Sequence, residues 1–153
     1  MKAPLRGLAM VVVTASGLTG CDRLPPPTGA NGPSVLVKHG VVGRWAFDCS
    51  KAAGVDNPNL IYVISASGDP TEQVVIDAKH DRTSKLQAIV ELEGGYVQWE
   101  QRAGEGAATI VTKIDGKRMQ TWHATHSDGT LLVDKGRYSG GSETPWFTRC
   151  DAN

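Results

Sequence analysis

The most reactive side chains in this sequence are its three cysteines, because thiols form disulfides, hold metals and accept acyl groups. The first of them closes the run Leu18-Thr19-Gly20-Cys21. An apolar stretch over residues 7–18 leads into this run, and the basic residues Lys2 and Arg6 precede the stretch. A basic segment, an apolar stretch and a small-residue ending are together the layout of a bacterial secretory signal.

The ending resembles the lipobox of bacterial lipoproteins, in which a branched apolar residue and two small residues precede an invariant cysteine. This resemblance implies that residues 1–20 are removed as a signal peptide, that Cys21 is thioether-linked to diacylglycerol, and that its new N-terminal amine is acylated. It also implies a cell-envelope protein that is anchored to a membrane and faces the periplasm. Asp22, directly after the cysteine, resembles the inner-membrane retention signal of enteric lipoproteins, which favours the inner over the outer membrane.

With Cys21 occupied by lipid, Cys49 and Cys150 remain, and an oxidising envelope compartment favours a disulfide between them. Such a bond would close a loop of about 100 residues and contribute about 4–5 kcal/mol from chain entropy. It would join the first strand of the folded domain to the last.

The histidines do not have the spacing of a metal site. His123 and His126 stand three residues apart, which on a strand places them on opposite faces, and His39 and His80 fall in expected loops. We therefore expect surface histidines, no metal, and no cofactor beyond the covalent lipid on Cys21.

The sequence also lacks a catalytic pattern. It contains no Gly-x-Ser-x-Gly nucleophile elbow, and a disulfide leaves no free thiol in the domain. The acidic pairs Asp77/Asp81 and Glu91/Glu93 are expected on solvated faces and turns rather than in acid–base pairs. These observations favour a protein that is not an enzyme and has no catalytic residues.

Charge and hydropathy exclude two classes of partner and one mode of membrane attachment. Without Lys2 and Arg6, acidic residues outnumber basic ones by two, so no strong field draws the protein to nucleic acid or to anionic lipid. The apolar stretch of the signal is too short to cross a bilayer of about 30 Å as a helix. Membrane attachment is therefore expected to rest on the lipid.

The composition divides the chain into three parts. After the signal peptide of residues 1–20, residues 21–39 hold three successive prolines and several glycines, which predicts an extended tether that holds the domain off the membrane, with a short edge strand as an option over residues 34–38. Residues 40–153 form one domain, long enough for a single core.

Strand and turn patterns dominate this domain. Alternating or continuous apolar runs separated by turn residues predict eight or nine short strands. Asp115-Gly116 and Asp128-Gly129 suit two-residue hairpin turns, because both turn residues must tolerate positive φ. Leu86, Ala88, Val90 and Leu92 are expected on one face, interrupted only by Ile89. The predicted fold is a small all-β, up-and-down antiparallel barrel, which hides its edges by closing on itself, with a β-sandwich as the alternative.

Gly43-Arg44-Trp45 on the first strand and Arg149 on the last resemble the lipocalin pattern, in which a tryptophan plugs one barrel end and an arginine packs across it. The resemblance implies that Trp45 and Arg149 form a structural plug. The Thr-Asp-x-x-Tyr motif of lipocalins is not found in the sequence, and convergent use of such a plug is an equal alternative.

Two further resemblances concern the whole domain. Trp45-Ala46-Phe47-Asp48-Cys49-Ser50 together with Phe147-Thr148-Arg149-Cys150 is similar to small exported β-barrel proteins of proteobacteria that have no assigned activity. The lipid anchor and stapled barrel also resemble inhibitors of c-type lysozyme. Their Ser-Gly-x-x-Tyr loop is not reproduced here, since Thr71 and Glu143 stand at the tyrosine position.

Three functions follow as expectations. The first is a non-enzymatic, lipid-anchored binding or interaction module that recognises a protein or an envelope component. The second is a lipocalin-like carrier of a small apolar ligand, although large side chains would fill much of so small a barrel. The third is a lysozyme inhibitor.

Overall fold

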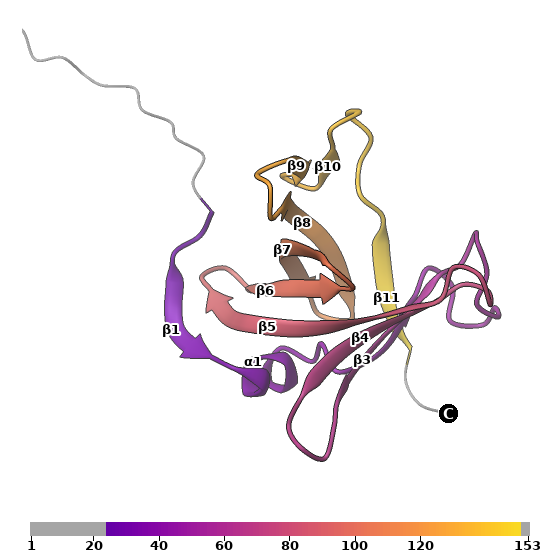
Figure 1. Cartoon of the computed structure of the whole chain (residues 1–153), viewed down its shortest axis with the longest axis horizontal. Helices are drawn as coiled ribbons and strands as arrows, with labels where there is room; N and C mark the ends of the chain where they lie inside the picture. Colours follow the sequence, from indigo (N-terminus) through magenta and orange to yellow (C-terminus); the bar gives the residue numbers. More distant parts are fainter. Residues whose placement is uncertain (1–23, 151–153) are drawn as a thin grey trace, which may run out of the picture.

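The computed structural model describes residues 24–150; the predicted signal peptide and Cys21 lie outside the described residues. Strands pair antiparallel in the order β2-β3-β4-β5-β6-β7-β8-β11, and β11 pairs in turn with β2. The protein is therefore a closed eight-stranded antiparallel β-barrel, as the sequence predicted, and not a sandwich (Figure 1). Closure leaves no free edge in the ring itself.

Seven barrel strands follow one another along the chain, and the eighth is the last strand. They span Gly43–Ala46 (β2), Asn59–Ile64 (β3), Pro70–Val75 (β4), Arg82–Leu92 (β5), Tyr96–Ala103 (β6), Gly106–Asp115 (β7), Arg118–His126 (β8) and Trp146–Cys150 (β11). Leu131–Asp134 (β9) and Arg137–Tyr138 (β10) extend the sheet from β8, and Pro27–Asn31 (β1) pairs with β5.

The N-terminal segment differs from the predicted tether. Pro27–Asn31 is a strand against β5, and Pro33–Lys38 is a helix (α1), where an edge strand was the option. Pro33 suits the first helical turn because the missing N–H has no helical partner there. Val35 and Leu36 are 2% and 1% exposed, so burial against the barrel core stabilises a helix too short to form alone. Within the predicted tether, residues 24–39 thus belong to the domain.

The barrel core gathers side chains from the ring and from α1. Inward residues of successive strands alternate with outward ones, as the pleat requires. The buried cluster consists of Val35, Leu36, Val41, Trp45, Tyr62, Leu86, Ile89, Val97, Trp99 and Met119. Helix α1 therefore closes one end of the barrel, below β5 in Figure 1.

A bulge in β5 interrupts the alternation that the sequence predicted. The pairing of β5 with β6 shifts between Gln87 and Val90, and Ala88 has a φ of 47°. One extra residue moves every later side chain to the other face. Leu86 and Ile89 consequently enter the core, at 3% and 4% exposed, while Ala88 lies exposed on the outside.

Trp45 and Arg149 lie together at the end that α1 covers. They are cross-strand partners, Trp45 is fully buried, and its indole N–H donates to the carbonyl of Val41 at 2.8 Å. The Arg149 guanidinium donates to the carbonyl of Val42 at 3.0 Å. Gly40 beside this guanidinium has a φ of 66°, a backbone conformation that favours glycine.

The disulfide joins Cys49 and Cys150, as predicted, with 101 residues of sequence separation. Strand β2 ends at Ala46, and the turn after it returns Cys49 to the last residue of β11. Only three residue pairs hold β11 to β2. The disulfide therefore fastens the seam at which the ring closes.

Glu91 links α1 to β5. It does not lie on the solvated face that the sequence predicted. Its carboxylate accepts hydrogen bonds from Lys38 Nζ at 2.8 Å and contacts His39 Nε2 at 2.8 Å. The Glu91 side chain is 11% exposed and that of His39 15%, so His39 is not the surface histidine that the sequence suggested. Hydrogen bonds from Lys38 and His39 lower the pKa of Glu91 to about 2.

The carboxylate of Glu91 is expected to make stability depend on acid. A folded-state pKa below the ordinary 4.5 means that Glu91 stabilises the fold fully above about pH 4.5 and progressively less as the pH falls to about 2. Urea unfolding between pH 7 and pH 2.5 will therefore show a shallower loss of unfolding free energy in Glu91→Gln than in wild type. Glu93→Gln, an exposed neighbour, is the matched control; equal slopes for both variants would contradict the assignment.

Candidate binding cavity

A cavity of about 300 Å³ lies inside the barrel, toward the end away from α1. Its mouth is formed where β2 ends and where β3 and β11 begin, with Phe47, Pro58 and Pro145 at these positions. Tyr138 of β10 also lines it. Phe47 lies just beyond β2, is 39% exposed, and packs against Phe147 with ring centroids 4.6 Å apart.

The cavity wall carries a buried carboxyl group on β4. Glu72 is 5% exposed and shares its face of β4 with Val74, which is 4% exposed. It accepts a hydrogen bond from the hydroxyl of Tyr62 at 2.9 Å and another from the amide of Gln101. The Gln101 amide also donates to the hydroxyl of Ser84 at 3.2 Å. Four strands, β3 to β6, therefore supply one polar cluster.

The electrostatics of this cluster follow from burial. Burial raises the pKa of Glu72, and the hydrogen bond from Tyr62, the charge of Arg82 and the hydrogen bond from Gln101 oppose that effect. Burial, together with the adjacent Glu72 charge, also raises the pKa of Tyr62 well above its ordinary value of 10. The Tyr62 hydroxyl accordingly stays protonated and remains a donor.

Trp99 of β6 adds an unused donor to the same wall. Its ring meets that of Tyr62 edge-on, with centroids 5.8 Å apart, and its side chain lines the cavity. Trp99 is 1% exposed, and its Nε1–H has no hydrogen-bond partner among the described residues. An unpaired buried donor costs about 1–3 kcal/mol. A ligand group that accepts this hydrogen bond would remove that cost.

The predicted site residues lie elsewhere. Trp45 and Arg149 are at the closed end, Cys49 and Cys150 are at the seam, and Cys21 is outside the described residues. The polar cluster was not predicted from the sequence. Glu72 and Val74 are two residues apart on β4, so they lie on the same face, and both are buried. A carboxylate two residues from a buried valine on a strand was the sequence signal that could have indicated the cluster.

The remaining candidates for chemistry do not converge on the cavity. His123 contacts Asp134 at 3.4 Å on the outer side of β8, and His80 contacts Asp77 at 2.8 Å. Within residues 24–150, no three or more histidine, cysteine, aspartate or glutamate side chains are grouped so that they could hold a metal ion.

Comparison with known proteins found no match for this chain among family models, curated proteins or solved structures. In the part of the chain that the structure describes, no helix is both long and apolar enough to cross a membrane.

Proposed function

We propose that this protein is a lipid-anchored, non-enzymatic binding protein of the cell envelope, which holds a small amphipathic ligand in the open end of its barrel. Cys21 carries the lipid and Asp22 favours the periplasmic face of the inner membrane, on the strength of their sequence context. Among the alternatives, a ligand carrier has the most support from the geometry, because the barrel interior is not filled. The observation that carries the proposal is the cavity; one of its lining residues, Trp99, has an unpaired buried N–H.

The ligand class follows from the cavity's lining. Aromatic and aliphatic side chains such as Leu60, Ile110 and Phe147 share the surface with polar ones, among them Gln101, Thr112 and Thr121. A purely apolar ligand would leave the Trp99 donor unpaired, whereas a carbonyl, hydroxyl or carboxylate oxygen could accept from it. We infer a ligand with an apolar body and one hydrogen-bond-accepting group, of a size that a cavity of about 300 Å³ admits.

The lining supports binding rather than catalysis. Of the described residues that line the cavity, Glu72 is the single carboxylate, and Tyr62 and Gln101 each occupy one of its oxygens. General acid–base chemistry requires a group free to exchange a proton with the substrate. The Glu72 carboxylate instead holds the side chains of Tyr62 and Gln101 in position in the cavity wall.

Prodan, a neutral naphthalene with a ketone oxygen, is the probe that tests this site. We expect its emission to increase and shift to the blue on addition of the wild-type protein. Thr121→Phe places a ring in the cavity and is expected to weaken prodan binding at least about ten-fold, the effect of roughly 1.4 kcal/mol. Trp99→Phe keeps the ring but removes the donor, and is expected to weaken binding about five-fold, within the range of one hydrogen bond.

Thr125→Phe is the matched control, since it makes the same substitution on the same strand but on the outer face. It should bind prodan as wild type does. Equal affinity in wild type and Thr121→Phe would show that prodan binds elsewhere, and a wild type that does not bind it would argue against an amphipathic ligand of this class.

A further inference from the structure

The packing of the N-terminal segment shortens the connection to the membrane. The sequence suggested a spacer of residues 21–39, but β1 and α1 take up most of it. Between Cys21 and Leu24, the first described residue, stand only Asp22 and Arg23. Three residues span at most about 10 Å. A lipid on Cys21 would therefore hold the surface around Leu24 against the bilayer.

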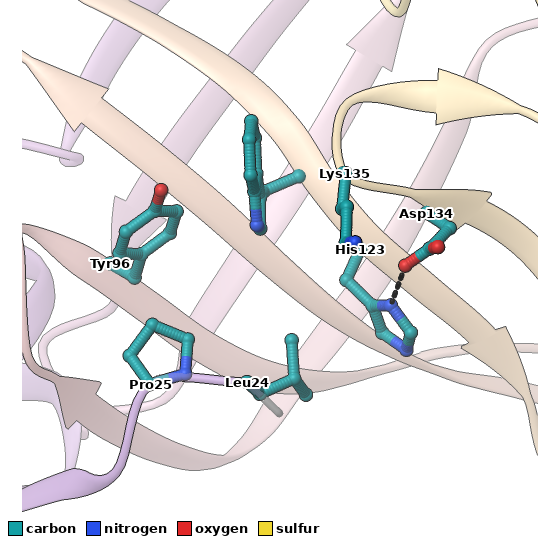
Figure 2. A pocket seen from close by; sticks show the side chains of 7 residues that line it. Leu24, Pro25, Tyr96, His123, Asp134 and Lys135 are labelled. Atoms are coloured by element: carbon teal, nitrogen blue, oxygen red, sulfur yellow. Dashed lines mark ion pairs between the residues drawn. The ribbon is translucent and has the colours of Figure 1, made fainter. Parts of the chain in front are cut away.

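That surface contains a groove on the outside of the barrel (Figure 2). Leu24 and Pro25 form one wall, and Tyr96 of β6 lies across from them. Trp122 of β8 also lines the groove. The groove has a volume of about 340 Å³. His123, paired with Asp134, closes one end of it. We call this set of residues the outer groove.

A bulge in β8 directs Trp122 into the outer groove. Val111 pairs with His123 and Thr112 with Thr121, which leaves Trp122 as the extra residue. Its ring lies against that of Tyr96, with centroids 5.6 Å apart, and Lys113 Nζ is 5.5 Å from the centroid of the indole. Tyr96 and Lys113 are themselves cross-strand partners on the outer face.

These side chains have the chemistry of a membrane interface. Tryptophan and tyrosine concentrate at the headgroup level, where an apolar ring and a polar atom are both accommodated. Lysine can place its methylenes beside the rings and its ammonium among the phosphates. Leu24 is 37% exposed next to the pair, although it is a large aliphatic residue.

We propose that the outer groove and its rim form a membrane-contact surface, which seats the barrel on the bilayer in one orientation when Cys21 is lipidated. The proposal rests on the lipid anchor proposed above and is independent of the ligand cavity. The occupant is a phospholipid surface, because the chain leads from Leu24 to Cys21 within about 10 Å. In this orientation β3 and β4, on the far side of the ring from β7 and β8, face away from the membrane.

Fluorescence quenching by nitroxide lipid tests the orientation. Mature lipidated protein is reconstituted into vesicles of phosphatidylethanolamine and phosphatidylglycerol, with a phosphatidylcholine that carries the nitroxide near its headgroup. We expect part of the tryptophan emission to be quenched, and Trp122→Phe to reduce the quenched fraction at least about two-fold. Leu24→Ser should reduce it in the same direction, since it removes apolar contact without removing a fluorophore.

A second tryptophan position serves as the control. In the Trp122→Phe background, Val63→Trp introduces an indole on β3 at a position that is 40% exposed in wild type. This indole is expected to escape quenching. Equal quenching at both positions, or no change in Trp122→Phe, would overturn the orientation and favour a soluble protein partner for the outer groove.

The anchor is checked separately, so that its failure is not mistaken for a failure of the surface. Mass spectrometry of the N-terminal peptide shows whether Cys21 carries acyl chains. An unacylated Cys21 would overturn the anchor and the membrane-contact surface together. An acylated Cys21 with unquenched Trp122 would overturn the membrane-contact surface alone.

Discussion

Loss of the Cys49–Cys150 disulfide is expected to lower the melting temperature by about 10–20 °C. The bond spans 101 residues of sequence, and cross-linking so long a loop contributes about 4–5 kcal/mol by restricting the unfolded chain. For a domain of this size, each kcal/mol corresponds to about 3–4 °C. Calorimetry without reductant compares the melting temperature of the wild type with that of the double variant Cys49→Ser/Cys150→Ser.

The position of the disulfide adds a local effect. Strands β2 and β11 have four and five residues, and three residue pairs join them. Without the bond, this seam should open before the rest of the barrel, because a strand pair held by few hydrogen bonds opens at low free energy. Amide exchange over Gly43–Ala46 should accelerate more than over β6 and β7.

Wild-type protein treated with reductant provides the control, since it loses the bond without a change in sequence. It should melt where the double variant melts. A melting temperature that is unchanged in both would show that packing alone holds the seam.

Cys21→Ala is expected to move the protein from the membrane fraction to the soluble fraction, or to leave it as the unprocessed precursor. The lipid that the lipobox implies would add about 0.8 kcal/mol of membrane affinity for each buried methylene, and two or more chains hold stably where one does not. The charge of the mature chain offers no substitute for the lipid, because acidic residues outnumber basic ones.

Fractionation with immunodetection measures this effect, and Cys49→Ser is the matched control. That variant also removes one thiol, but it leaves residues 1–21 intact and should remain with the membrane. If Cys21→Ala fractionates as wild type does, the lipoprotein interpretation is wrong, and attachment must come from the folded domain.

Much of the barrel could be read from local sequence. Turns lie at both predicted places, between β7 and β8 and between β8 and β9, and Gly116 and Gly129 have positive φ, at 59° and 88°. The expected turn type was wrong, because Asp115 and Asp128 do not have positive φ and Asp115 ends β7, where it pairs with Arg118. The turn positions could be predicted because turn chemistry and two-residue alternation are properties of neighbouring residues. Closure followed from the number of strands and from the cysteine pair at the two ends.

Other features depended on residues distant in sequence. Whether Ile89 or Val90 faces the core depends on where β5 bulges against β6, and no local pattern specifies that. The triple proline predicts a spacer, yet its last residue, Pro27, begins β1, which pairs with β5, and α1 covers the end of the core. In α1, burial of Val35 and Leu36 outweighs a local preference for extended chain.

The sequence by itself determined the strand-and-turn pattern and the two cysteines available for a disulfide, and it predicts a secretory signal that ends at Cys21. Only the tertiary structure determined the polar cluster of Glu72, Tyr62 and Gln101, and the outer groove. A carboxylate can be buried at Glu72 because the pairing of β3, β4, β5 and β6 brings donors from other strands to it. The outer groove exists because the N-terminal segment folds back beside β6 and β8, a contact that depends on the shape of the whole barrel.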